Sequence, residues 1–121
     1  MKIHSAIASC LSFVLLSASA LAVTWSGPVG LTLVELDPVS STGTSTYLSF
    51  ASTPSGKPGC GTATQGIMIP SAGISAEHVK SMTSLATAAF LAGKNVRVLW
   101  GGTCTTVGTD VFGNVTGIII Q

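Results

Sequence analysis

Apolar and polar residues alternate in several short stretches of this chain, as is typical of half-buried strands. The first predicted strand covers residues 29–36, where Val29, Leu31 and Leu33 fall on one face. Four further strands are predicted at residues 47–51, 62–69, 95–100 and 115–120. The glycine-rich residues 101–108 predict an irregular loop before the last strand.

The clearest helical pattern follows the third predicted strand. Ser75 is placed as N-cap, and Glu77 lies in the first turn, where a negative charge suits the helix dipole. Gly93 stands where a chain leaving a helix adopts a left-handed conformation. The apolar positions at helical spacing are Val79, Met82, Ala86, Ala89 and Phe90.

Three strands, one helix and two strands therefore follow one another. This order predicts a mainly β fold, a five-stranded barrel of the oligonucleotide/oligosaccharide-binding (OB) type with one helix between strands 3 and 4. A closed barrel leaves few exposed edges, which suits a chain with few charges. An α+β antiparallel sheet with one packed helix fits the same order.

The first 22 residues have the layout of a secretory signal peptide. Lys2 supplies the positive start, residues 6–16 are almost uninterruptedly apolar, and Ala20 to Ala22 form a small-x-small cleavage site. Residues 23–121 then form a single OB-like domain of about 100 residues. The apolar stretch is too short for a membrane span, and no later segment is long enough. A lipid-attachment role for Cys10 is disfavoured because most of the apolar region follows this residue.

Cleavage would remove Cys10 and leave Cys60 and Cys104. In an oxidising compartment two remaining thiols favour a disulfide, with two unpaired buried thiols as the alternative. The expected location is therefore secreted or periplasmic, in a bacterium. Two cysteines and His78 do not make a zinc ligand set, and no cofactor-binding motif is present, so we expect neither metal nor cofactor.

The whole chain has only five basic and four acidic residues, and the predicted cleavage removes one basic residue, Lys2. A neutral, charge-poor domain argues against nucleic acid as a partner. Catalysis is not predicted either. His78 beside Glu77 is typical of a solvated helix start, and Glu35 with Asp37 is typical of a solvated strand end.

Several short segments resemble a known family. They are residues 25–27 (Trp-Ser-Gly), the helix end at residues 89–93, the strand entry at residues 94–98, and Cys104. They resemble the pentameric B subunits of bacterial AB toxins, in particular the subtilase-cytotoxin B-subunit-like secreted proteins. The resemblance implies an oligomer-forming barrel that binds cell-surface sugars, with an exported enzymatic subunit as a partner. Because the resemblance is bacterial, the glycosylation sequon at Asn114 is interpreted as chance.

Sugar recognition favours aromatic faces with polar neighbours. The candidate ligand-binding residues are Trp25, Tyr47, Lys57 and Trp100. Each has a structural alternative. The alternation of Trp100 with Val96 and Val98 favours the core, and Tyr47 also fits a core position with its hydroxyl at the rim. Trp25 fits a cover over an apolar edge, and Lys57 fits a solvated loop charge. The functional hypothesis is a non-catalytic, oligomeric, glycan-binding module. The alternative is a periplasmic accessory or inhibitor protein that binds another protein.

Overall fold

The computed structural model describes residues 24–37 and 45–121. The predicted signal peptide lies outside them. The elements are strands β1 (Thr24–Trp25), β2 (Leu31–Asp37), β3 (Ser45–Phe50) and β4 (Gln65–Met68), the short 3-10 helix η1 (Pro70–Ala72), helix α2 (Ala76–Ala92), and strands β5 (Val96–Val107) and β6 (Asp110–Ile120).

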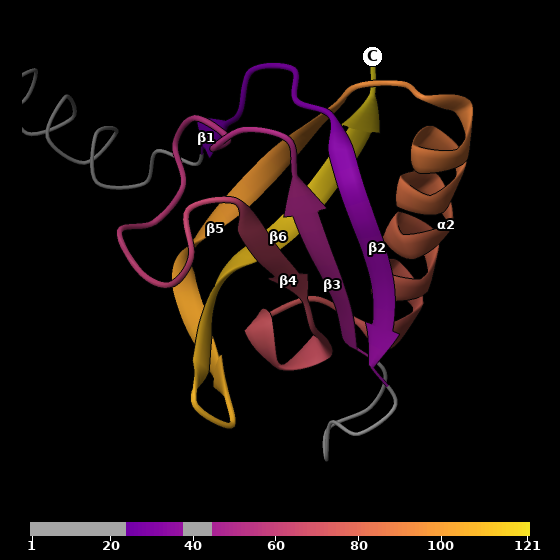
Figure 1. Ribbon diagram of the computed structural model, residues 1–121. Coiled ribbons are helices and arrows are strands. Elements are labelled where there is room, and N and C mark those ends of the chain that lie inside the picture. Colours follow the sequence, from indigo (N-terminus) through magenta and orange to yellow (C-terminus); the bar gives the residue numbers. More distant parts are fainter. Residues whose placement is uncertain (1–23, 38–44) are drawn as a thin grey trace, which may run out of the picture.

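The described strands form one six-stranded mixed sheet with helix α2 beside it (Figure 1), in the order β1-β5-β6-β4-β3-β2. Neighbours are antiparallel except β4 and β6, which run parallel. The parallel pair arises because the chain crosses through α2 to β5 before β6 returns beside β4. The fold is therefore mixed α+β, and the expectation of a purely antiparallel sheet is wrong at this pair.

The predicted barrel is not closed within the described residues, since no hydrogen-bonded ladder joins the end strands β1 and β2. These two strands nevertheless belong to one continuous segment. Its first part pairs with β5, where Ser26 N–H donates to the Val98 carbonyl at 2.8 Å and Val29 bridges Val96. Its second part leaves β5 and pairs with β3, starting at Leu31. The segment thus brings opposite ends of a curled sheet close together.

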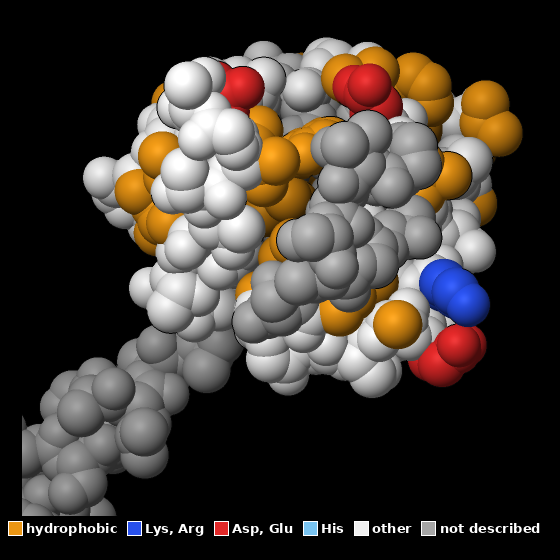
Figure 2. Space-filling view, turned by 90° about the horizontal axis from the view of Figure 1, so that it is seen from below, with side chains coloured by type: hydrophobic (Ala, Val, Ile, Leu, Met, Phe, Trp, Pro, Cys, Tyr) orange, Lys and Arg blue, Asp and Glu red, His pale blue; other side chains and the backbone are white. Residues whose placement is uncertain are grey.

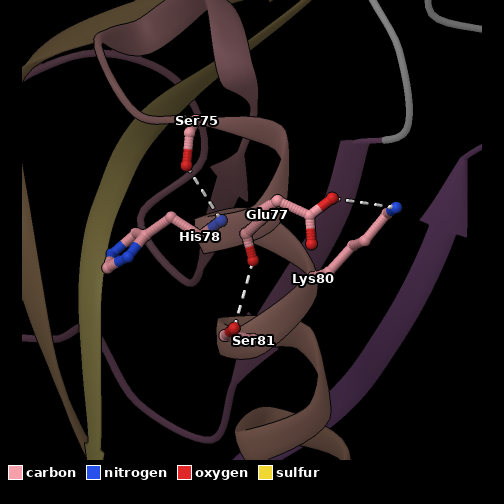
Figure 3. Close-up of polar contacts among 5 residues, drawn as sticks. All are labelled: Ser75, Glu77, His78, Lys80 and Ser81. Atoms are coloured by element: carbon pink, nitrogen blue, oxygen red, sulfur yellow. Dashed lines mark hydrogen bonds and ion pairs between the residues drawn. The ribbon is translucent and has the colours of Figure 1, made fainter.

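The helix prediction is confirmed at both ends. The Ser75 hydroxyl accepts a hydrogen bond from the His78 backbone N–H at 3.1 Å (Figure 3), and Gly93 has the left-handed φ of 65°. Of the predicted apolar face, Phe90 is the exception at 41% exposed, because it lies one position beyond the buried stripe. The helical residues that are buried are Val79, Met82, Ala86 and Ala89.

The last two strands differ most from expectation. Residues 101–107 belong to β5, and β6 begins at Asp110, so the predicted loop is a long hairpin with Gly108 in its two-residue turn. The other strands differ from prediction by a few residues at their ends. Backbone pairing, rather than apolar alternation, defines the hairpin.

The core lies between the sheet and the buried face of α2. Its centre is Trp100, 2% exposed, whose indole N–H donates to the Ser55 carbonyl at 3.2 Å. The ring lies against Gly66 and Gly113, where added Cβ atoms would come within 3.3 and 3.1 Å of it. Two glycines therefore make room for the largest core side chain. Other members of the core include Leu48, Phe50, Met68, Val96, Val98, Val115 and Ile118.

Candidate functional site

A cleft of about 270 Å³ lies between strands β2, β3 and β4 and the tip of the β5–β6 hairpin. We call it the hairpin cleft. Its lining residues are Leu33, Glu35, Tyr47, Leu48, Ser49, Gln65, Val107, Asp110 and Phe112. Five strands contribute to it, so its shape depends on how the hairpin lies against the sheet.

A bulge in β5 marks the base of that hairpin tip. Trp100 pairs with Val115 and Cys104 pairs with Gly113, so three residues of β5 stand opposite only Asn114 of β6. Gly102 lies within this bulge with φ of 80°, a conformation that favours glycine. Bulges bend the strand that carries them, and this one therefore sets the direction of the hairpin tip.

Asn114 holds the bulge from the opposite strand. Its side chain is 2% exposed, its Oδ1 accepts from Thr105 Oγ1 at 2.7 Å, and its Nδ2 donates to Thr103 Oγ1 at 2.9 Å. Both ends of the amide are thus bonded to hydroxyls that flank Cys104. The buried and bonded amide makes the Asn114 sequon unsuited to glycosylation in the folded protein.

The loop between β3 and β4 secures the hairpin from another side. Cys60 in this loop and Cys104 in β5 form the predicted disulfide, with a Cα–Cα distance of 6.5 Å. Next to it Gly61 approaches β6 so closely that an added Cβ would lie 1.9 Å from the Val111 carbonyl oxygen. Lys57 stabilises the loop itself, since its ammonium group donates hydrogen bonds to the carbonyls of Pro58 and Cys60. The disulfide and this close backbone contact hold the hairpin base to the loop.

The hairpin cleft combines aromatic and polar groups. The rings of Tyr47 and Phe112 lie 5.0 Å apart at 42°, one from the sheet and the other from the hairpin. The carboxylates of Glu35 and Asp110 are exposed, and Gln65 and Ser49 are half-buried. Figure 2, seen from below relative to Figure 1, shows acidic side chains bordering apolar surface at its upper edge.

The four predicted binding residues are not brought together. Tyr47 lines the hairpin cleft, whereas Trp100 is in the core and has almost no surface to offer a ligand. Trp25 is 38% exposed on β1, with its ring beside Gly117 of β6. Lys57 is used by its own loop, as described above. Only Tyr47 therefore remains in the candidate site.

The hairpin supplies three of the cleft residues that the sequence interpretation missed, Val107, Asp110 and Phe112. Phe112 and Asp110 follow a stretch that was predicted to be irregular, and no pattern placed them near Tyr47. Other cleft residues did have a signal within their own predicted strands. Gln65 and Glu35 are polar residues within predicted strands, as expected of an outward face.

The helix start offers no catalytic arrangement within the described part of the chain. Figure 3 shows the His78 ring turned away from Glu77 and Lys80, and its Nε2 lies 3.2 Å from the Thr116 carbonyl oxygen. Glu77 instead forms an exposed ion pair with Lys80 at 3.4 Å. Among residues 24–37 and 45–121, no group of three or more His, Cys, Asp or Glu side chains is placed to hold a metal ion.

A second groove of about 320 Å³ lies between α2 and β2. Its floor includes Thr46 and Thr83, whose hydroxyls are 2.7 Å apart. Because Thr83 donates its only hydroxyl proton to the Val79 carbonyl, Thr46 is the donor in this pair. The groove contains no aromatic side chain, so it lacks the stacking face that the hairpin cleft has.

Comparisons with protein-family models, with curated proteins and with solved structures found no match. Among the described residues, no helix is long and apolar enough to cross a membrane. The Cys60–Cys104 disulfide is of a kind that persists mainly in oxidising compartments.

Proposed function

We propose that this protein is an exported, non-catalytic module that binds glycans in the hairpin cleft. The observation that carries the proposal is the Tyr47–Phe112 ring pair set among carboxylate, amide and hydroxyl side chains in one cavity. Sugars have an apolar C–H face and a rim of hydroxyls. A lining with both kinds of group is suited to them.

Each part of the cleft has a role in this proposal. The exposed portions of the two rings stack on the apolar face of one sugar residue. Glu35 and Asp110 accept hydrogen bonds from sugar hydroxyls, and charged acceptors give the stronger bonds. The side-chain amide of Gln65 both donates and accepts hydrogen bonds, as sugar hydroxyls do, so it fixes the orientation of the bound sugar ring. The cavity volume suits one or two sugar residues rather than a long chain.

The proposed fold is a partly open barrel of the OB type. In support, the strand order β2-β3-β4-β6-β5 has α2 between β4 and β5, and the segment that contains β1 and β2 pairs at both ends of the sheet. OB folds bind oligosaccharides and oligonucleotides on the face of their second and third strands. These correspond to β3 and β4, which contribute Tyr47, Ser49 and Gln65 to the cleft.

Oligomer formation and export complete the proposal. Exposed apolar side chains lie on α2, namely Leu85, Phe90 and Leu91, and these would form contacts between copies. The signal-like first 22 residues and the disulfide support a secreted or periplasmic location. Together with the resemblance to toxin B subunits, they support a ring-forming module that associates with an exported enzymatic subunit.

The exposed apolar residues of α2 also favour the second candidate function. In this alternative they contact another protein, and the module is a periplasmic accessory or inhibitor protein. Light scattering separates the two. Copies associated at micromolar concentration favour the first function, and a monomer that binds no glycan favours the second.

A glycan array with the purified protein tests the first function directly. We expect retained oligosaccharides, with Tyr47→Ala and Phe112→Ala each weakening binding about thirtyfold, the loss that marks an interface hot spot. Trp25→Ala is the matched control, because Trp25 is an aromatic residue with exposed surface outside the cleft. Thermal unfolding of each variant checks that the protein remains folded. Binding that is unaffected by both cleft substitutions would contradict the proposal.

A further inference from the structure

The charges of the hairpin cleft are all of one sign. Its acidic residues are Glu35 and Asp110, both exposed, and none of the described residues that line it is lysine, arginine or histidine. They come from β2 and from the start of β6, so carboxylates are supplied by both walls of the cavity. The cleft is therefore a site of negative potential in a chain whose formal net charge is +1.

The lysine and arginine residues of the described chain lie outside the cleft lining. Lys57 donates to the carbonyls of its own loop, and Lys80 pairs with Glu77. Arg97 donates through Nε to the Ser26 carbonyl at 2.8 Å, and Lys94 follows the helix C-cap. In Figure 2 the visible basic side chain lies low in the view beside an acidic one, away from the acidic groups at the upper edge.

We infer that the hairpin cleft selects glycans that carry a free, protonated amino group over neutral and acidic glycans. The inference rests on the proposed glycan-binding function and names the ligand class of the same site. An ammonium group between Glu35 and Asp110 forms charge-assisted hydrogen bonds, and the rings of Tyr47 and Phe112 add cation–π attraction. A sugar carboxylate or sulfate would meet like charge with no basic partner.

The size of the preference follows from the exposure of the carboxylates. An exposed ion pair strengthens an association by about 1.4-fold to about fivefold. Two pairs predict that a free amine binds about twofold to about thirtyfold more tightly than its acetylated counterpart. Because exposed charges are screened by salt, the preference falls as ionic strength rises.

The test is titration calorimetry with two oligosaccharides of equal length, one of glucosamine and one of N-acetylglucosamine, and with a sialylated oligosaccharide. It is done at about pH 6, below the ordinary pKa range of amines. We expect the glucosamine oligosaccharide to bind most tightly and the sialylated one most weakly. The double variant Glu35→Gln/Asp110→Asn keeps the shape of both side chains, so it should lose the part of the preference that comes from the carboxylates and keep only the part that comes from the rings. Glu77→Gln is the matched control, since it removes a carboxylate outside the cleft and should keep the preference.

Two results separate this inference from the proposed function. Equal or weaker binding of the free-amine oligosaccharide, or a preference that is undiminished in the double variant, would overturn the selectivity while glycan binding stands. A protein that binds none of the three oligosaccharides, and none on the array, would overturn both.

Discussion

Replacing Asn114 with alanine should destabilise the protein and loosen the hairpin cleft together. The substitution removes two hydrogen bonds, from Thr105 Oγ1 and to Thr103 Oγ1, and leaves a space at a position that is 2% exposed. Each such bond contributes about 0.5–1.5 kcal/mol net. Thr103 is exposed and Thr105 half-buried, so water can replace part of what their hydroxyls lose. The expected loss is about 1–3 kcal/mol.

Urea unfolding measures this loss. For a small domain the free energy of unfolding falls by about 1–3 kcal/mol per molar urea, so the midpoint should move down by about 1 M. Asn95→Ala is the matched control, because Asn95 is an exposed asparagine, and surface substitutions stay within about 0.5 kcal/mol. A double-mutant cycle with Thr105→Ala should show coupling of about 0.5 kcal/mol or more.

The same variant tests whether the bulge positions the cleft. Phe112 and Asp110 lie beyond Asn114 on the hairpin tip, so loosening the bulge should weaken glycan binding even under conditions where the variant is folded. An unchanged urea midpoint, or strictly additive effects in the cycle, would refute the role given to Asn114. Full binding by a folded but destabilised variant would refute its link to the cleft.

Three further predictions concern the frame of the protein. Gly93→Ala should lower the free energy of unfolding by about 1 kcal/mol or more, because alanine is strained at the left-handed φ of this position. Gly59→Ala is the control and should lower it little, since Gly59 also lies in open space but does not have a positive φ. Equal unfolding midpoints for the two variants would contradict the C-cap assignment. Replacing Cys60 and Cys104 with serine should lower the free energy of unfolding by about 2–5 kcal/mol, because the bridge joins residues 44 apart, and a smaller shift would show that the loop is held without it. Mass spectrometry of the exported protein should show loss of residues 1–22, and a different starting residue would contradict the assigned cleavage site.

The helix was predictable because its signals are local. Ser75 and Gly93 act through the backbone of their own turns, and the buried stripe repeats at the helical period. Phe90 was wrongly predicted to be buried for the same reason. The helical spacing of apolar residues extends to Phe90, but the buried stripe of the helix ends at Ala89.

The β5–β6 hairpin was not predictable by the same means. Residues 101–107 are glycine, threonine, cysteine and valine without apolar alternation. After the bulge at residues 101–103, residues 104–107 form a strand because residues 110–113 pair with them. Such pairing depends on tertiary context more than on intrinsic propensity. The parallel contact of β4 with β6 likewise depends on where the chain returns after α2.

Because the hairpin could not be predicted, the candidate site could be predicted only in part. Tyr47 could be selected as an aromatic residue with polar neighbours, whereas Phe112 reaches it only through the bulge at Gly102 and the Asn114 hydrogen bonds. The alternation of Trp100 with Val96 and Val98 favoured the core over a binding face, and Trp100 does lie in the core, where Gly66 and Gly113 make room for its ring.

The most direct test of the central claim is to map ligand contacts by NMR. Amide chemical shifts of the isotopically labelled protein would be followed during titration with the glucosamine oligosaccharide. Binding in the hairpin cleft predicts that the largest changes fall at Tyr47, Gln65 and Phe112, with the amides of α2 and of Trp25 almost unmoved. Changes centred on Trp25 or on α2, or no change at saturating concentrations of any oligosaccharide, would contradict the proposal.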